Sequence, residues 1–262
     1  MRKPFFELRH FVVRQDRCGG KVTSDACAFG ALATTWMGNR PSRILDIGTG
    51  TGILAMLCAQ RFLLKTTTTT TTTIIDAVEI DRDAAAQARD NAAAFFPNIK
   101  VHCNDALRFA PSNRYDAIVC NPPFFGATRE AATRQRNLAR HDTRLPPTGL
   151  LDTVSRLLEP RGVFCVLLGA RFSEPRRAFC DLALQRGLVL AAAVEFADRP
   201  DSPPHVVAMA FTTRHVGPRR LVVPDRLDFF AEPGVGWRAP TPRLAALMAD
   251  VYTDKYLRRP PP

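Results

Sequence analysis

Short apolar runs alternate with segments of helical spacing along most of the chain, and this pattern sets the predicted order of elements. Runs of aliphatic and β-branched residues predict strands at 7–13, 20–22, 44–47, 74–79, 99–102, 115–120, 163–168, 188–196 and 206–212. Apolar positions three or four residues apart predict helices at 25–37, 53–62, 83–94, 150–158, 174–185 and 242–257. This alternation indicates an α/β protein with a doubly wound, mostly parallel sheet. The last two strands have no helix between them, so they are predicted to pair antiparallel.

A loop of alternating glycines and threonines follows the third predicted strand, with glycine at positions 48, 50 and 52. Glycine lets the backbone turn tightly and pass close to a ligand, and the next helix then directs its unpaired N–H groups at that ligand. A dinucleotide-binding loop would need its third glycine where this chain has Ile53. An acid on the strand, Asp46, followed by Gly48, Gly50 and Gly52 instead resembles motif I of class I S-adenosylmethionine (SAM) methyltransferases. A tight turn without a ligand is the alternative.

Three more polar side chains, Glu79, Asp105 and Asn121, follow the ends of predicted strands, as Asp46 does. In an open parallel sheet, ligands bind outside the carboxyl ends of the strands. Glu79 can accept hydrogen bonds from both ribose hydroxyls of a cofactor, and Asp105 can accept one from its adenine amino group. Any one of these acids could be a turn residue. Together with the glycine loop, the set predicts a site for SAM, whose product is S-adenosylhomocysteine.

The run Asn121-Pro122-Pro123-Phe124 resembles the [DNS]-P-P-[YFW] signature of methyltransferases that act on planar amides and amines. An adenine N6 shares its lone pair with the ring and is a poor nucleophile. The Asn121 side-chain oxygen and the Pro122 carbonyl can each accept an N6 hydrogen, which directs the lone pair at the donor methyl group. The prolines fix that carbonyl, and Phe124 can stack on a flipped base. These four residues are the predicted catalytic set, with a stiffened strand exit as the alternative.

A closer resemblance comes from the N-terminal segment. Phe11-Val12-Val13 through Asp16-Arg17-Cys18, followed by Lys21-Val22-Thr23-Ser24-Asp25, resembles the family that methylates N6 of the adenine next to the anticodon in a valine transfer RNA (tRNA). The motifs above, Ala131-Ala132-Thr133-Arg134, Ala139-Arg140-His141 and Thr241-Pro242 extend the resemblance over nearly the whole chain. The departures are eight threonines at 66–73, Phe124 where tyrosine is common, and proline-rich insertions near the C-terminus.

This resemblance implies a class I SAM methyltransferase fold, Rossmann-like, with a seven-stranded, mostly parallel sheet and an antiparallel last strand. It also implies a single methyltransferase domain over residues 1–262. Residues 5–25 would be an N-terminal extension that closes the SAM site, 65–73 a poly-Thr loop, and 215–262 a C-terminal strand and helix extension. Lys21, Thr23 and Asp25 would then join the cofactor-binding residues.

The net charge of +11 and the sequence pI of about 9.9 indicate a polyanionic partner. The predicted RNA contacts are Arg129, Arg134, Arg136 and Arg140, which crowd the segment after the catalytic motif. A solvated basic face is the alternative. No apolar run reaches membrane-spanning length, and the five histidines form no cluster, so neither a membrane anchor nor a metal site is expected.

Seven cysteines without C-x-x-C spacing predict reduced, mostly buried thiols in an intracellular protein. A cytoplasmic location is expected, and a mitochondrial one is left open. Cys120 is expected to be a buried strand thiol rather than a nucleophile.

The leading functional hypothesis is SAM-dependent N6-methylation of adenine in RNA, with tRNA near the anticodon as the expected substrate. Methylation of the N5 amide of protein glutamine and of adenine N6 in ribosomal RNA are alternatives, because these enzymes share the glycine-loop and Asn-Pro-Pro motifs. A non-catalytic RNA-binding subunit of the same fold is the alternative from another class. The intact set of Asp46, Glu79 and Asn121 argues against it. Oligomeric state and the need for an activating protein partner are left open.

Overall fold

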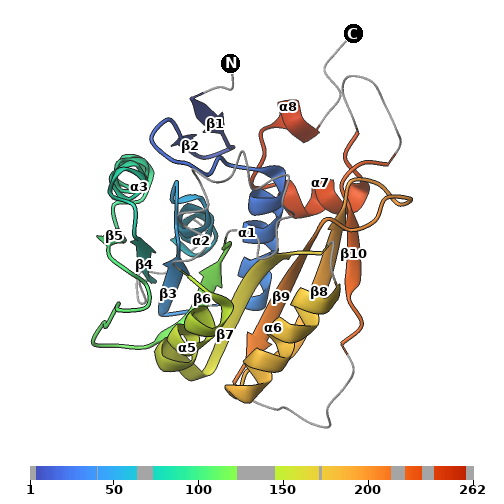
Figure 1. The fold of residues 1–262 in the computed structure, drawn as a ribbon. Helices are drawn as coiled ribbons and strands as arrows, with labels where there is room; N and C mark the ends of the chain where they lie inside the picture. The colour runs from blue at the N-terminus through green and yellow to red at the C-terminus, as the bar shows by residue number, and fades with distance from the viewer. Residues whose placement is uncertain are drawn as a thin grey trace.

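A computed structural model describes residues 4–39, 41–63, 73–122, 145–170, 173–213, 222–231 and 239–257. Eight strands form the main sheet, in the order β10-β8-β9-β7-β6-β3-β4-β5 (Figure 1). Their bounds are β3 Arg43–Ile47, β4 Ile74–Glu79, β5 Ile99–Cys103, β6 Tyr115–Cys120, β7 Leu158–Gly169, β8 Val189–Ala197, β9 Val206–Thr212 and β10 Asp225–Asp228. β9 runs antiparallel to β7 and β8, and the other neighbours in the sheet pair parallel. The predicted mostly parallel α/β sheet with an antiparallel strand is therefore confirmed.

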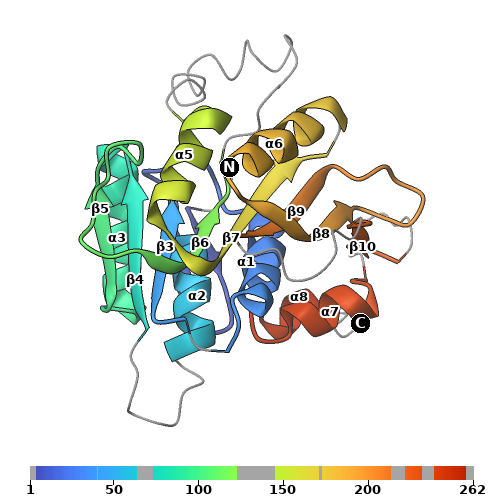
Figure 2. The same cartoon turned by 90° about the horizontal axis from the view of Figure 1, so that it is seen from below.

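The helices lie in two layers around this sheet. They are α1 Ser24–Trp36, α2 Ile53–Leu63, α3 Arg82–Phe95, α5 Pro147–Leu157, α6 Ser173–Gln185, α7 Pro242–Met248 and α8 Asp254–Leu257. Figure 2 shows α1, α2 and α7 on one face of the sheet and α5 and α6 on the other. α3 packs on β4 and β5 at the opposite edge from β10. Each face has its own cluster of buried apolar side chains, which explains why the central strands are apolar at successive positions.

The N-terminal segment differs from its prediction. Instead of strands at 7–13 and 20–22, the structure has a short antiparallel hairpin of β1 Phe5–Glu7 and β2 Val12–Arg14. The Leu8 N–H donates to the Phe11 carbonyl at 2.9 Å, which turns the chain in the middle of the predicted first strand. At 20–22, the Val22 N–H donates to the side chain of Gln15 at 2.9 Å rather than to a neighbouring strand.

The predicted final helix, 242–257, is also different, because it is broken into α7 and α8. The N–H groups of Val251 and Tyr252 both donate to the Met248 carbonyl at 2.9 Å, which ends α7. Arg9 then binds the carbonyls of the same two residues, through its N–H at 2.8 Å and its Nε at 3.0 Å. The break therefore docks the C-terminal segment on the N-terminal hairpin.

Side chains of α8 continue this contact between the two ends of the chain. The ring of Phe6 stacks on Tyr256 with a centroid distance of 5.9 Å, and Glu7 forms an ion pair with Lys255. Arg9 also pairs with Asp254 at 2.5 Å. Figure 1 shows the hairpin at the top of the view, between α3 and α8.

β10 lies within 215–262, where a C-terminal strand and helix extension was predicted, and it joins the seven-stranded sheet as an eighth strand. It pairs parallel with β8, from Asp225 opposite Val194 to Asp228 opposite Ala197. The guanidinium of Arg226 donates to three carbonyls of the β8–β9 connection at 2.7–2.8 Å, namely those of Arg199, Pro200 and Ser202. Of the poly-Thr tract, only Thr73 lies within the described residues.

A cluster of polar and charged side chains surrounds the buried Asp76 of β4, on the face of the sheet that α5 covers. Asp76 is 4% exposed and accepts a hydrogen bond from the Tyr115 hydroxyl at 3.0 Å. Its two oxygens also contact Arg43 at 3.1 Å and His102 at 2.7 Å. The Arg43 guanidinium lies 5.4 Å from the centre of the Tyr115 ring. Burial and the Asp76 charge raise the pKa of Tyr115, so this hydroxyl stays protonated and donates.

We expect Tyr115→Phe to lower the free energy of unfolding by about 1–2 kcal/mol, because one hydrogen bond to a buried carboxylate is lost while the ring still packs. The matched control is Tyr256→Phe. Tyr256 is 40% exposed, and we expect its variant to stay within about 0.5 kcal/mol of the parent protein. Urea unfolding followed by circular dichroism measures both. Equal stability of the two variants would show that the cluster does not depend on the Tyr115 hydroxyl.

Candidate active site

Four strands end together at the carboxyl edge of the sheet. Ile47 at the end of β3 is level with Val78 of β4 and with Cys120 of β6, and Glu79 is level with Cys103 of β5. The glycine loop, Glu79, Asn104-Asp105 and Asn121 therefore leave neighbouring strands at the same level. The sequence predicts this arrangement, because the carboxyl ends of parallel strands meet at one edge.

The glycine loop turns through three left-handed residues between β3 and α2. Gly48, Gly50 and Gly52 have φ angles of +68°, +55° and +86°. The N–H groups of Gly48 and Thr49 donate to the Val78 carbonyl at 2.9 and 3.1 Å, which fixes the start of the loop on the end of β4. Residues with side chains are strained at such φ angles, so glycine is required by backbone conformation.

The Glu79 carboxylate fixes the rest of the loop. Its Oε2 accepts the Gly50 N–H at 2.9 Å, and its Oε1 accepts the Asp81 N–H at 3.0 Å. Asp81 in turn caps α3 by accepting the N–H groups of Asp83 and Ala84, each at 3.0 Å. The residue predicted to bind ribose thus also holds the glycine loop. Each of its oxygens retains a lone pair for a further donor.

Asp46 is buried beneath the loop, with no exposed surface. Its Oδ2 accepts the Thr49 hydroxyl at 2.5 Å and the Ala55 N–H at 3.1 Å. Among the described residues, no group donates a hydrogen bond to its Oδ1. Burial raises the pKa of Asp46 to about 7, and the nearby Glu79 charge acts in the same direction. A buried carboxylate oxygen without a donor is a position where a cationic or N–H-bearing ligand would be stabilised.

Asp105 follows the end of β5, and Asn121 follows the end of β6. These two strands flank β4 and β3 in the sheet. Asp105 accepts the Leu107 N–H through Oδ1 at 2.9 Å, and its side chain is 31% exposed. Asn121 is partly exposed at the end of β6, and Pro122 after it is buried. Pro123 and Phe124 lie outside the described residues, as do the predicted RNA contacts Arg129, Arg134, Arg136 and Arg140.

Cys120 precedes Asn121 and is fully buried. Burial raises its pKa well above the ordinary value, so the thiol stays protonated and is no nucleophile. All seven cysteines are free, and five are buried, as predicted.

The three N-terminal residues predicted to join the cofactor site make structural contacts. The Lys21 ammonium donates to the carbonyls of Gln15 and Cys18, the second at 3.0 Å. The Thr23 hydroxyl caps α1 by accepting the Ala26 N–H at 3.1 Å. Asp25 pairs with His205 at 2.9 Å, which joins α1 to the β8–β9 connection. These contacts define the fold of the segment next to the site.

Two buried amides on α3, Gln87 and Asn91, were not identified from the sequence, although they contact this segment. They are 1% and 3% exposed. The signal was present, because two polar residues four positions apart interrupt a helix face that otherwise consists of alanines. Their contacts are tertiary and could not be assigned from spacing alone.

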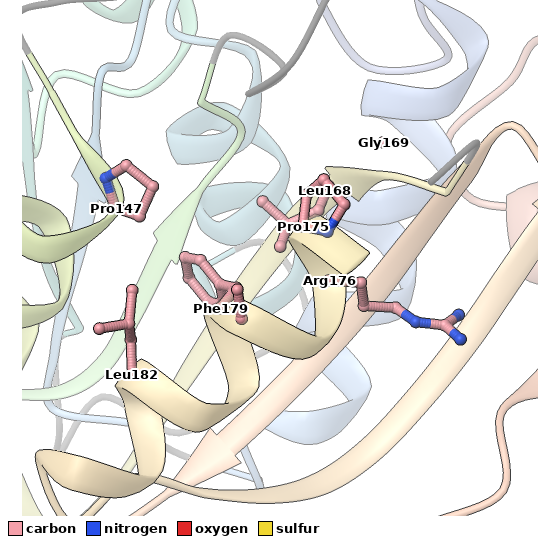
Figure 3. Close-up of a pocket in the computed structure, with 8 residues that line it drawn as sticks. Pro147, Leu168, Gly169, Pro175, Arg176, Phe179 and Leu182 are labelled. Carbon is pink, nitrogen blue, oxygen red and sulfur yellow. The ribbon is translucent and has the colours of Figure 1, made fainter. Parts of the chain in front are cut away.

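A small apolar cavity of about 150 Å³ lies over the end of β7, between the first turns of α5 and α6 (Figure 3). Phe179 and Leu182 point toward Pro147, whereas the Arg176 guanidinium points away and pairs with Glu195 at 2.5 Å. The cavity is lined by none of the described residues of the glycine loop or of β4, so it is separate from the predicted cofactor site.

The described residues provide neither a metal centre nor a membrane-spanning helix. No group of three or more His, Cys, Asp or Glu side chains is placed to hold a metal ion there. Among the same residues, no helix has the length and apolar character needed to cross a membrane.

Comparison with known proteins places this site in a family. A family model described as methyltransferase small domain matches residues 28–163. A tRNA1(Val) (adenine(37)-N6)-methyltransferase from Citrobacter koseri is 37% identical over 235 residues, which are 87% of this chain and 91% of the relative. A protein of the same name from Dyadobacter fermentans is 34% identical over 257 residues, covering 96% of this chain and 98% of the relative.

Solved structures agree on the fold. A predicted O-methyltransferase from Agrobacterium tumefaciens superposes with a TM-score of 0.60 at 18% identity, covering 86% of this chain and 95% of that one. A SAM-dependent methyltransferase from Aquifex aeolicus gives a TM-score of 0.51 at 12% identity, covering 72% and 93%. The sheet is that of the class I SAM methyltransferases. Given the extent of its similarity to the curated relatives, the chain belongs to the tRNA1(Val) (adenine(37)-N6)-methyltransferase family.

Proposed function

We propose that this protein transfers the methyl group of SAM to N6 of an adenine in tRNA, next to the anticodon. The observation that carries the proposal is the position of Asn121 and Pro122, which leave β6 at the same edge of the sheet as the glycine loop and Glu79. The relatives' names support the substrate, because they specify adenine 37 of a valine tRNA. The net charge of +11 supports a polyanionic partner.

The described residues fit the proposed cofactor. Glu79 retains acceptor capacity at the end of β4, where it would bind the ribose hydroxyls, and Asp105 is exposed enough to accept from the adenine amino group. The buried Asp46 Oδ1 would receive the positive charge of the methionine part. Gly48, Gly50 and Gly52 carry no side chains that would block the approach of a ligand to the loop.

SAM would supply a methyl group on a sulfonium: the N6 lone pair would attack the methyl carbon, S-adenosylhomocysteine would leave as the C–S bond breaks, and the N6 proton would pass to solvent. The task of the protein is therefore to orient the amine and keep water out. Asn121 would accept one N6 hydrogen through its side-chain oxygen, and the Pro122 carbonyl would accept the other. Burial of Pro122 keeps that carbonyl in one position. Phe124 would stack on the flipped adenine, and Arg129, Arg134, Arg136 and Arg140 would contact the RNA backbone. A cytoplasmic site of action stays a prediction.

We expect Asn121→Ala to lower the turnover number by at least about 100-fold, because it removes an oriented acceptor from the transition state. Binding of S-adenosylhomocysteine should stay within about threefold of the parent protein, because Asn121 leaves a different strand from Glu79. Asn121→Asp is the matched control. It keeps an acceptor oxygen, and aspartate occurs in the signature, so it should retain measurable activity. Undiminished turnover of Asn121→Ala would remove Asn121 from its proposed role.

The substrate is tested with radiolabelled SAM and unmodified cellular RNA, followed by digestion to nucleosides. We expect N6-methyladenosine in the tRNA fraction. Label confined to protein would overturn the RNA assignment in favour of glutamine methylation. Label in ribosomal RNA would retain the reaction and change the substrate.

Asp46 makes cofactor affinity depend on pH. Its pKa of about 7 in the folded protein means that much of it is protonated at pH 6, and the ammonium group that S-adenosylhomocysteine shares with SAM binds the ionised form better. S-adenosylhomocysteine affinity should therefore rise by about tenfold from pH 5.5 to pH 8. Asp46→Asn should bind more weakly and lose this dependence. Calorimetric titrations at four pH values measure both proteins, and parallel profiles would contradict the assignment.

The same residue affects stability with the opposite sign. Between about pH 4 and pH 7, folded Asp46 holds a proton that the unfolded chain has lost, so its contribution to the free energy of unfolding falls as pH rises. Asp46→Asn should be less sensitive to pH over this window. Urea unfolding at pH 5 and pH 7 gives the comparison.

A matched pair of glycine variants tests the loop. Gly50 and Gly38 have φ angles of +55° and +75°, and a Cβ at either position meets nothing within 4 Å. Alanine at each should cost about 1–2 kcal/mol of stability through backbone strain. Only Gly50→Ala should weaken S-adenosylhomocysteine binding, by about tenfold or more, because Gly38 ends α1 away from the loop. Equal binding by the two variants would argue against the loop as the cofactor site.

A further inference from the structure

Residues 14–18 follow the N-terminal hairpin and are held against the glycine loop by a buried amide of α3. The Asn91 Oδ1 accepts the Arg14 N–H at 3.0 Å, and its Nδ2 donates to the Arg14 carbonyl at 2.8 Å. The same Nδ2 donates to the carbonyl of Thr51, inside the glycine loop, at 2.9 Å. One side chain therefore links the backbone of the N-terminal extension to the backbone of the loop.

Gln87 lies one turn before Asn91 on the same face of α3. It makes similar hydrogen bonds to Asp16 and Arg17, which follow Arg14 in the extension. The Gln87 Oε1 accepts the Arg17 N–H at 2.7 Å, and its Nε2 donates to Asp16 Oδ1 at 3.0 Å. This hydrogen bond is the main reason that the pKa of Asp16 lies below its ordinary value. The Arg17 guanidinium also forms an ion pair with Asp90, which lies between the two amides on the helix.

The segment held in this way lies beside Glu79. Cys18 is 5% exposed, and burial together with the charges of Glu79 and Asp81 raises its pKa to about 11. The Glu79 carboxylate that influences Cys18 is the one that accepts the Gly50 N–H. Residues 14–18 are thus joined to the glycine loop through Asn91, which binds both Arg14 and the Thr51 carbonyl, and Cys18 lies within range of the Glu79 charge.

Stability alone does not account for two amides at these positions. The rest of this buried face of α3 consists of Ala84, Ala85, Ala88 and Ala92. Buried amides must be desolvated, and each contributes little net free energy when its hydrogen bonds are made. Satisfied polar side chains in an apolar layer instead fix one geometry, because every displaced arrangement leaves them unpaired.

We propose that Gln87 and Asn91 are positioning residues for the methyl donor, which hold residues 14–18 against the glycine loop as one wall of the cofactor site. The inference rests on the proposed cofactor-binding roles of the loop and of Glu79. When the wall is in place, the loop is fixed on two sides, by Glu79 and by Asn91. When it is displaced, the cofactor site is open on the side of the extension, and the donor dissociates faster.

A reversal of the Gln87–Asp16 hydrogen bond tests this directly. Gln87→Glu keeps the acceptor for the Arg17 N–H but places a carboxylate against Asp16, so at pH 8 it should displace the segment. Asp16→Asn alone keeps an acceptor and should be nearly neutral. The double variant Asp16→Asn with Gln87→Glu restores the hydrogen bond with donor and acceptor exchanged. Arg186→Ala is the control for stability, since Arg186 binds Asp152 and the Leu182 carbonyl between α5 and α6.

The readouts are S-adenosylhomocysteine affinity by calorimetry, without RNA, and the melting temperature. We expect Gln87→Glu to weaken binding by about tenfold or more, Asp16→Asn to stay within about twofold, and the double variant to recover to within about threefold. Arg186→Ala should lower the melting temperature and leave affinity unchanged. Unchanged affinity in Gln87→Glu, or a double variant as weak as the single one, would overturn the proposal. The binding assay contains no RNA, so its result does not depend on which substrate the protein methylates. A wrong substrate assignment would therefore leave the expected result unchanged.

Hydrogen exchange in the parent protein covers the case in which Gln87→Glu does not fold. The backbone amides of Arg14 and Arg17 donate to Asn91 and Gln87. They should exchange more slowly when S-adenosylhomocysteine is bound, because the bound ligand and residues 14–18 stabilise each other. Asn91→Asp keeps the acceptor and loses both donors, so it should lose this extra protection and bind more weakly. Exchange at these two amides that is unaffected by the ligand would contradict the proposal.

Discussion

The hydrogen bond from the Gly50 N–H to the Glu79 carboxylate is the contact on which the rest of the site depends. It joins two loops that leave neighbouring strands, and neither loop has regular structure of its own. The same carboxylate accepts the Asp81 N–H and so sets the first turn of α3. From there α3 carries Gln87 and Asn91 to the N-terminal extension. One acid at the end of β4 therefore orders the glycine loop directly and the wall beside it through a helix.

The electrostatics of this edge follow from the same arrangement. Asp46 is fully buried, and its burial, together with the nearby charge of Glu79, raises the pKa of Asp46. Two carboxylates in a confined space favour a ligand that brings positive charge and several donors. A sulfonium with an amino group and a ribose has this character, which is why the fit of SAM rests on acceptors rather than on basic residues. The basic residues of the chain would then be available for the proposed polyanionic substrate.

Much of this could be predicted from the sequence, and the reasons differ between elements. Both ends of β4, β6 and β9 were predicted correctly, because buried central strands are apolar and are followed by residues that favour turns. Thr23 caps α1 by accepting the N–H of Ala26, only three positions away, which is the kind of local contact that a sequence can specify. The strand-end acids could be placed at one edge because parallel strands align their carboxyl ends.

The elements that were missed depend on distant partners. A strand was expected somewhere in 215–262, but its position could not be given, because β10 has only four residues, three of them charged, and becomes a strand by pairing with β8. The break between α7 and α8 is stabilised by Arg9, more than 240 residues earlier in the chain. Gln87 and Asn91 contact residues about 70 to 77 positions away. Sequence periodicity carries no information on such distances. An N-terminal extension beside the cofactor site could therefore be expected, but the two amides that hold it could not be identified.

The contact between the β1–β2 hairpin and α8 has a consequence for the order of folding. Its partners are 243 to 248 positions apart in the sequence. Closing so large a loop costs more conformational entropy than pairing neighbouring elements, and contacts of this kind form slowly. The hairpin leads into the segment that Gln87 and Asn91 hold. We therefore expect the glycine loop and the central strands to form first, and the hairpin to dock on α8 as a late step.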